Sequence, residues 1–200
     1  MFSGIYQSIT TLAIIATFSI TDWILTLRYD RQRQAEGSAK SWDITTIVTI
    51  ATIFLIVQPA LLPWMGLHTN AWWGLLLQTV GILLTLGGLG LHWWSRTHLQ
   101  QFYAERTEVQ PGHRLVDSGP YAYVRHPMFS AYFMFAGGLL LINPAIPTLI
   151  TAIYTFWDFV RAARRGEQLL AKKLPDYVDY MARTPRFLPK FRKYSKGEQS

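Results

Sequence analysis

Long apolar runs separated by short polar segments dominate this chain. Three runs have the roughly 17 to 25 residues that a membrane-spanning helix requires, and they lie at about 4–27, 44–66 and 71–95. Two shorter runs lie near 128–142 and 145–160. The pattern predicts an all-α, polytopic membrane protein with about five transmembrane helices.

The last two apolar runs are joined by the short segment "INPAIP". Asn143, Pro144 and Pro147 end one helix and start the next with almost no loop between them. We therefore expect spans four and five to form a tight helical hairpin.

The composition agrees with a membrane protein. Half of the residues are hydrophobic and the mean hydropathy is +0.14, which is more apolar than a typical soluble domain. The chain has no cysteine, which excludes disulfides, thiolate metal sites and cysteine nucleophiles. The net charge of +7 lies in segments between and after the apolar runs, so we expect no nucleic-acid partner.

The basic residues alternate between successive loops. None lies in "LHTN" or "INPAIP", whereas 11 of the 19 Lys and Arg residues lie from Arg161 onward. The other basic segments follow spans one and three, with Arg28, Arg31, Arg33, Lys40, Arg96, Arg106, Arg114 and Arg125. The positive-inside rule then predicts an external N-terminus and a cytoplasmic C-terminus, in the plasma membrane of a prokaryote.

We expect residues 1–200 to form a single membrane domain. Residues 1–70 would supply two N-terminal spans, and residues 71–200 a catalytic core with a C-terminal cytoplasmic helix. The cofactor-binding segments would be the polar, cytoplasmic stretches before span four and after span five.

The segment "GPYAYVRHPMF" places polar groups at the start of span four. Gly119 and Pro120 predict a turn, and Pro127 suits the first turn of a helix. Arg125 and His126 then lie at a helix N-terminus, where free N–H groups, the helix dipole and a guanidinium favour an anionic ligand. The alternative is an arginine that meets lipid phosphate beside a histidine that caps the helix.

A second segment, "EQLLAKKLPDYVDYMARTPRFLP", follows span five and begins with Glu167. Its apolar positions predict an amphipathic helix, pressed on the membrane or against the segment before span four: Leu169, Leu170, Leu174, Tyr177 and Tyr180. That packing would bring Glu167 towards Arg125. The alternatives are a solvated ion-pair face and, for the closing "PRFLP", a helix stop that anchors at the membrane surface.

The two segments, in this order and two spans apart, resemble the isoprenylcysteine carboxyl methyltransferase family, part of a wider group with phospholipid methyltransferases. The resemblance runs from about Leu89 to Pro189. Two positions depart from the family pattern: Gly166 stands where the first of two acids is usual, and Leu174-Pro175 stands for the usual F-G. The matching positions are Gly119, Pro120, Tyr121, Arg125, His126, Pro127, Phe129 and Glu167.

The resemblance implies an S-adenosylmethionine site without a Rossmann domain. Arg125 and His126 would grip the cofactor's carboxylate, and Glu167 would accept from its ammonium group; these three are the expected catalytic residues. Gly119, Pro120, Tyr121 and Tyr123 complete the implied cofactor-binding set, with the two tyrosines near the adenosyl group. No metal site is expected.

The function implied is methyl transfer to a lipid-like or prenylated acceptor, similar to an isoprenylcysteine carboxylate, at the inner membrane face. The alternatives are a phospholipid or small-thiol methyltransferase, a sterol-type reductase using NADPH, and a non-catalytic membrane factor. An amine acceptor would need a base, for which His126 is the only candidate.

We interpret Asp22 as reaching water or an arginine, and His92 as facing the bundle or the membrane interface. The oligomeric state is not predicted.

Overall fold

A computed structural model describes residues 3–29, 42–67, 72–99 and 115–189. Over these ranges the chain is helical and has no strand, which confirms the all-α prediction. The helices are α1 (Ile5–Tyr29), α3 (Trp42–Leu61), α4 (Trp72–Leu99), α5 (Pro127–Ile142), α6 (Ile146–Lys173) and α7 (Asp176–Arg183). Two 3₁₀ turns, η1 (Pro63–Met65) and η3 (Gly119–Ala122), lie between them.

Each of the five apolar runs coincides with a helix. Among the described residues, Ile5–Arg28 with 24 residues and Trp72–Leu99 with 28 are long and apolar enough to cross a membrane. Thr49–Leu61 and Pro127–Ile142 are shorter apolar helices. The hairpin is confirmed, because α5 ends at Ile142 and α6 begins four residues later. The number of spans stays a prediction.

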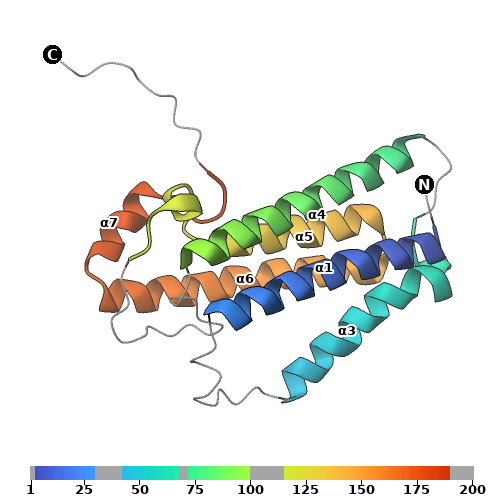
Figure 1. The fold of residues 1–200 in the computed structure, drawn as a ribbon, viewed down its shortest axis with the longest axis horizontal. Helices are drawn as coiled ribbons and strands as arrows, with labels where there is room; N and C mark the ends of the chain where they lie inside the picture. Colours follow the sequence, from blue (N-terminus) through green and yellow to red (C-terminus); the bar gives the residue numbers. More distant parts are fainter. Residues whose placement is uncertain (1–2, 30–41, 68–71, 100–114, 190–200) are drawn as a thin grey trace.

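The helices lie lengthwise beside one another, as Figure 1 shows for α1, α4, α5 and α6. α7 and η3 lie at one end of this bundle, and the α5–α6 turn lies at the other end. The C-terminal ends of α1 and α4 lie at the α7 end, and their last turns contain Arg28 and Arg96. Five further charges used in the orientation argument lie outside the described residues: Arg31, Arg33, Lys40, Arg106 and Arg114.

Side-chain amides hold the α5–α6 turn to the N-terminal helices. Gln7 and Gln78 each donate from Nε2 to the Ile142 carbonyl oxygen at 3.1 Å. Asn143 Nδ2 donates to Gln58 Oε1 at 2.8 Å. These buried bonds satisfy polar groups that would be costly to leave unpaired away from water, and they fix α1, α3 and α4 around the hairpin.

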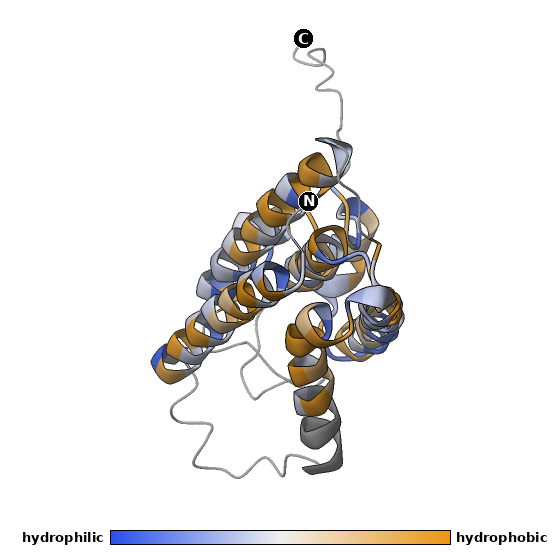
Figure 2. Ribbon diagram, turned by 90° about the vertical axis from the view of Figure 1, so that its right-hand side faces the viewer, coloured by the Kyte–Doolittle hydropathy of each residue, from blue (hydrophilic) through white to orange (hydrophobic). Residues whose placement is uncertain are grey.

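α4 has an inverted distribution of polarity. Its outer surface exposes large apolar side chains, including Leu75, Leu76, Val80 and Leu83. Figure 2 shows hydrophobic residues along the whole length of the helices. Its buried face contains only glycine and polar residues: Gly74, Gln78, Gly81, Thr85, Gly88, His92, Ser95 and Arg96. A soluble helix buries its apolar face instead, so this helix is built for apolar surroundings.

Glycines allow α4 and α5 to pack closely. A Cβ added at Gly81 would lie 2.7 Å from the Gly138 carbonyl oxygen, and one added at Gly88 would lie 2.8 Å from that of Ala131. Both approaches are too short for a real Cβ. Gly81 and Gly88 are therefore small residues that allow close helix packing, and the packed helices α4 and α5 support the site.

Candidate functional site

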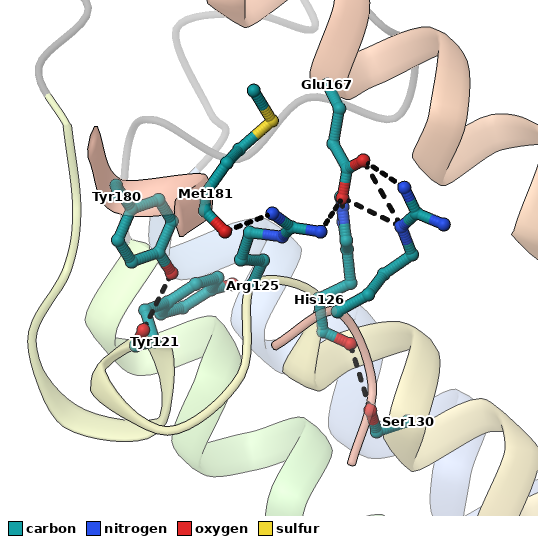
Figure 3. A network of polar contacts seen from close by, with 8 residues as sticks. Tyr121, Arg125, His126, Ser130, Glu167, Tyr180 and Met181 are labelled. Carbon is teal, nitrogen blue, oxygen red and sulfur yellow. Dashed lines mark hydrogen bonds and ion pairs between the residues drawn. The ribbon is translucent and has the colours of Figure 1, made fainter. Parts of the chain in front are cut away.

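The carboxylate of Glu167, on α6, lies at the centre of a network of three basic side chains (Figure 3). Arg125 Nη2 lies 3.2 Å from Glu167 Oε1, and His126 Nε2 lies 3.0 Å from the same oxygen. Arg186 binds both oxygens, with Nε at 3.0 and 3.2 Å and Nη2 at 2.5 Å from Oε2. The structure thus brings Glu167 to Arg125, as the amphipathic pattern predicts.

The centre of the network is shielded from solvent, while the Arg186 side chain is 34% exposed. The Glu167 side chain is 7% exposed and that of Arg125 is 11% exposed. Arg125 therefore does not face lipid phosphate, which was its alternative interpretation. A charge buried to this degree is stable only when it is paired and hydrogen-bonded, and the three basic partners provide that pairing.

His126 occupies the N-cap position of α5, with Pro127 next to it in the first turn. Its side chain makes no capping hydrogen bond, so the interpretation of His126 as a helix cap is wrong. The ring instead reaches Glu167 at 3.0 Å. Because an ionised carboxylate can only accept, the Nε2 atom of His126 carries the proton in this contact.

The "PRFLP" segment crosses the N-terminus of α5. The backbone N–H groups of Arg125 and His126, which we expected to be free for a ligand, donate to the carbonyl oxygens of Pro185 and Arg186 at 2.9 and 3.0 Å. Ser130 Oγ donates to the Phe187 carbonyl at 2.7 Å. The segment therefore forms a wall of the site and supplies Arg186. This role is additional to the helix stop and membrane-surface anchor that we expected from the sequence.

Arg125 also connects α6 to α7. Its Nη1 atom donates to the carbonyl oxygen of Met181 at 2.9 Å, while Nη2 pairs with Glu167. Its Nε atom is buried and has no hydrogen-bond partner among the described residues. One N–H donor of this buried guanidinium thus makes no hydrogen bond within the described residues. Buried donors are normally paired with protein, water or ligand.

The turn before α5 has a conformation that depends on glycine. Gly119 has φ of +58°, and a Cβ at this position would collide with the ring of His98 on α4. The following Pro120 is buried. The predicted turn at Gly119-Pro120 is therefore confirmed, and its cause is a left-handed backbone held against α4.

The two tyrosines of the motif have different surroundings. Tyr121 is buried, and its carbonyl oxygen accepts a hydrogen bond of 2.6 Å from the hydroxyl of Tyr180 on α7. Tyr123 is 62% exposed, and its ring centroid lies 6.5 Å from that of Trp94 on α4. The structure therefore brings Tyr121 towards the α7 side of the site and leaves Tyr123 at the surface beside α4.

The electrostatics of the site follow from this arrangement. Burial raises the pKa of Glu167, but the hydrogen bonds from His126 and Arg186 and the charge of Arg125 outweigh it and lower the pKa to about 2. The hydrogen bond to Glu167 raises the pKa of Arg186. Burial, then the charge of Glu167, raises the pKa of Tyr177 to about 12. Glu167 is therefore ionised at neutral pH and holds charge rather than exchanging protons.

The charges of the site do not cancel. Two guanidiniums, those of Arg125 and Arg186, share one carboxylate. The surplus positive charge favours an anionic group, and the carboxylate can also accept from a cationic one. A ligand that carries both charges close together matches this set.

Arg186 is the residue of the network that sequence reasoning missed. Its signal was present in the "PRFLP" ending, which lies beyond the acid motif. Gly166, in place of an acid, is half-buried next to Glu167. Leu174 ends α6 and Pro175 precedes α7, so the altered pair forms the corner between these helices.

Residues 80–172 match the model of the isoprenylcysteine carboxyl methyltransferase family. The nickel-cobalt-cadmium resistance protein NccN of Alcaligenes xylosoxydans xylosoxydans is 29% identical over 60% of this chain, and the match spans 54% of that relative. Protein-S-isoprenylcysteine O-methyltransferase of Mus musculus is 34% identical over 42% of this chain and 30% of its own length.

The fold has a counterpart among solved structures. The eukaryotic intramembrane Ras methyltransferase ICMT superposes with a TM-score of 0.59 at 17% identity, over 90% of this chain and 67% of that chain. At this identity the likeness concerns the helical membrane fold. The family match over residues 80–172, which contains the Arg125-His126 motif and Glu167, confirms the resemblance of this chain to the isoprenylcysteine carboxyl methyltransferase family.

Proposed function

We propose that this protein transfers a methyl group from S-adenosylmethionine to a lipophilic acceptor at the inner face of a membrane. The observation that carries the proposal is the network in which Arg125, His126 and Arg186 converge on Glu167. This network lies where an apolar helix bundle meets its polar end. It is assembled from the two family motifs and from the "PRFLP" segment.

The residues of the network fit the amino-acid end of this cofactor. That end carries a carboxylate and an ammonium group side by side, and the site offers surplus guanidinium charge beside a carboxylate whose pKa is held at about 2. The buried Nε of Arg125 has no partner among the described residues, so it is a donor that a ligand carboxylate would satisfy.

The bound cofactor would supply an electrophilic methyl group. Arg125 and His126 would hold its carboxylate, and Glu167 would accept from its ammonium group. Tyr121, with the turn at Gly119 and Pro120, would form the wall on the adenosyl side, and Tyr123 would close it from the surface. Methyl transfer mainly requires that the reactants be aligned and kept from water, so no residue of this network has to move a proton.

The acceptor class is taken from the family and from the surroundings of the site. The mouse relative is named for O-methylation of isoprenylcysteine, and a prenylated carboxylate is the first acceptor to test. The exposed apolar side chains of α4 and α6, such as Leu83 and Ile153, would let a lipid-like substrate approach from the bilayer. The N-outside, C-cytoplasmic orientation in a prokaryotic plasma membrane belongs to the same proposal.

The other candidates have less support from this network. A phospholipid amine or a small thiol would use the same donor site. A sterol-type reductase would need a nicotinamide cofactor, and a non-catalytic factor would need no paired acid and bases. Gly166 is the feature that favours a lost activity, but Glu167 beside it keeps all three basic partners.

The test is isothermal titration of detergent-purified protein with S-adenosylmethionine and S-adenosylhomocysteine. The Arg125→Ala and Glu167→Ala variants should lose binding by about 10- to 100-fold, the range expected for a charge-assisted contact. Arg183→Ala is the matched control, because Arg183 pairs with Asp117 at an exposed position, 62% and 48% exposed respectively.

The outcomes separate the candidates. Binding by the wild type and by Arg183→Ala, with loss in both network variants, would support the donor site. Folded wild-type protein that bound neither ligand would refute it, and a titration with NADPH would follow. Transfer of a labelled methyl group to N-acetyl-S-farnesylcysteine tests the acceptor class.

A further inference from the structure

An acid and a base meet inside the helix bundle, away from the Glu167 network. His92 Nε2, on α4, lies 3.1 Å from Asp22 Oδ1, on α1. We interpreted Asp22 as reaching water or an arginine, but the structure pairs it with His92. Ionisable residues within membrane helices are costly and mark functional sites by default.

The pair has the geometry of a proton acceptor. Since a carboxylate can only accept, the Nε2 atom of His92 carries a proton and Asp22 fixes the orientation of the ring. The other ring nitrogen, Nδ1, is buried and has no hydrogen-bond partner among the described residues. An acid that orients one nitrogen of a histidine and leaves the other free to take a proton is the arrangement that activates hydroxyl and thiol nucleophiles.

A continuous set of aromatic rings links this pair to the donor site. The ring centroid of His92 lies 5.5 Å from that of Tyr132, and Tyr132 lies 4.9 Å from Phe159. Phe159 stacks at 4.9 Å on Phe129, which stacks at 5.4 Å on His126. Tyr132 is six residues beyond His126 on α5, a rise of about 9 Å, so the pair lies deeper in the bundle than the donor site.

Aromatic side chains flank His92 on two sides. Phe18 and Tyr132 flank the ring at 4.8 and 5.5 Å, while the Asp22 side chain is 36% exposed. The charged and titratable groups near His92 are Asp22 on α1, Arg96 one turn further along α4, and Tyr132 on α5. A carboxylate acceptor needs no base, because it is already nucleophilic at neutral pH. The pair therefore points to acceptors that must lose a proton.

We propose that the Asp22–His92 pair is the proton acceptor for lipophilic thiols, which this protein would methylate on sulfur in addition to carboxylates. The inference rests on the proposed methyl transfer. The thiol proton moves to His92 Nδ1, and the sulfur lone pair forms the new S–CH₃ bond as the methyl–sulfonium bond breaks. The products are a methyl thioether and S-adenosylhomocysteine, and the imidazolium then returns its proton to solvent.

A thiol suits this base better than an amine does. A cysteine-type thiol has a pKa of about 8.5 and an alkyl ammonium group one of about 10.4. The proton of such a thiol is thus about two pKa units easier to remove than that of an ammonium group. Asp22 acts through His92 and is a positioning residue.

The test compares two acceptors in detergent-purified protein loaded with S-adenosylmethionine: N-decanoylcysteine methyl ester, a lipophilic cysteine thiol, and N-acetyl-S-farnesylcysteine. His92→Gln should lower the rate with the thiol by about 100-fold or more, the usual contribution of a general base. Asp22→Asn should lower it less and shift its pH profile. The rate with the farnesylated carboxylate should change far less. Thr79→Val, an exposed position of α4, is the matched control for a substitution in this helix.

A second readout does not depend on turnover. The ultraviolet absorbance of the thiolate, measured on N-decanoylcysteine methyl ester bound to cofactor-free protein, should rise at a lower pH in the wild type than in His92→Gln. The affinity for S-adenosylmethionine, measured by titration, should be the same in both proteins.

Each outcome supports or overturns the role of the Asp22–His92 pair as proton acceptor. Selective loss of thiol methylation, with unchanged cofactor affinity, supports the inference. Wild-type protein that methylates the carboxylate but not the thiol overturns it and leaves the proposed function standing, as does equal thiol methylation in His92→Gln. Loss of cofactor binding in both variants would make the pair a structural tie between α1 and α4, which also overturns it. Wild-type protein without cofactor binding refutes both proposals.

Discussion

Arg186 holds both carboxylate oxygens of Glu167, with its Nη2 atom 2.5 Å from Oε2 and its Nε atom 3.0 Å from Oε1. The two residues come from different elements, α6 and the segment after α7. Two parallel bonds between a guanidinium and a carboxylate fix direction as well as distance. The contact therefore sets where the C-terminal segment lies against α6.

Replacing Arg186 tests this relationship. Arg186→Lys keeps the charge but cannot form the planar pair of bonds. We expect it to lower the free energy of unfolding by about 1 kcal/mol. Arg186→Ala should lower it by about 2 kcal/mol, because Glu167 then keeps only two of its three basic partners. The unfolding midpoint in detergent measures the loss of stability. Titration with S-adenosylmethionine should also show weaker binding in both variants.

Arg183→Lys is the matched control, since the Arg183–Asp117 pair is exposed and exposed pairs contribute little. If Arg186→Lys behaved like Arg183→Lys in both measurements, the contact would have no special role. Such a result would return "PRFLP" to the role of a surface anchor.

Acid should weaken the protein through Glu167. The pKa of this group is lowered from 4.5 to about 2 in the folded state, so the folded form holds the carboxylate ionised more strongly than the unfolded form does. The resulting stability is fully present above pH 4.5 and is lost as the pH falls towards about 2. Its size is on the order of 3 kcal/mol.

The measurement is the unfolding midpoint at several pH values between about 7 and 3. Glu167→Gln should be less stable than the wild type at neutral pH and should lose less stability on acidification. Asp179→Asn, at an exposed position of α7, should keep the wild-type profile. Parallel profiles for the wild type and Glu167→Gln would contradict the assignment of this acid sensitivity to Glu167.

The sequence predicted the helices well because their cause is local. Each apolar run is long enough to be recognised without its neighbours, and the prolines of "INPAIP" mark the hairpin. The end of α6 was harder to predict, since the helix continues to Lys173 through polar residues. Its last turns are held by packing against α7 and the segment before α5. Contacts of this kind cannot be predicted from a run of hydrophobic residues.

The site was predicted in part for the same reason. Arg125, His126 and Glu167 lie in motifs that stand out between apolar runs, and the structure brings them together. Arg186 and the Asp22–His92 pair were missed because each depends on a partner far away in the chain. Asp22 and His92 are 70 residues apart, and only the crossing of α1 and α4 makes them neighbours.

The turn before α5 should not tolerate a side chain at Gly119. Gly119→Ala adds two costs, a left-handed φ of +58° and a collision with His98. We expect a loss of about 2 kcal/mol or more in the free energy of unfolding and weaker cofactor binding. Gly4→Ala separates the two costs, because Gly4 has φ of +57° but an open environment, with its nearest atom 3.9 Å away. Equal losses in both variants would show that the contact with His98 has no effect.

Two neighbouring glycines of α5 give the sharpest test of the α4–α5 packing. A Cβ at Gly138 would lie 2.7 Å from the Gly81 carbonyl oxygen and would collide with Thr85 Oγ1, whereas a Cβ at Gly137 would meet only Leu84 Cδ2, at 3.6 Å. Gly138→Ala should therefore cost about 1 to 3 kcal/mol, since backbone rather than a flexible side chain must shift. Gly137→Ala should be neutral or stabilise by up to about 1 kcal/mol, because alanine favours the helix. Thermal unfolding of the two variants in the same detergent compares them directly. A larger loss in Gly137→Ala would mean that α5 faces α4 with its Gly137 side rather than its Gly138 side, and that the contact of Gly138 with α4 does not support the Arg125-His126 motif.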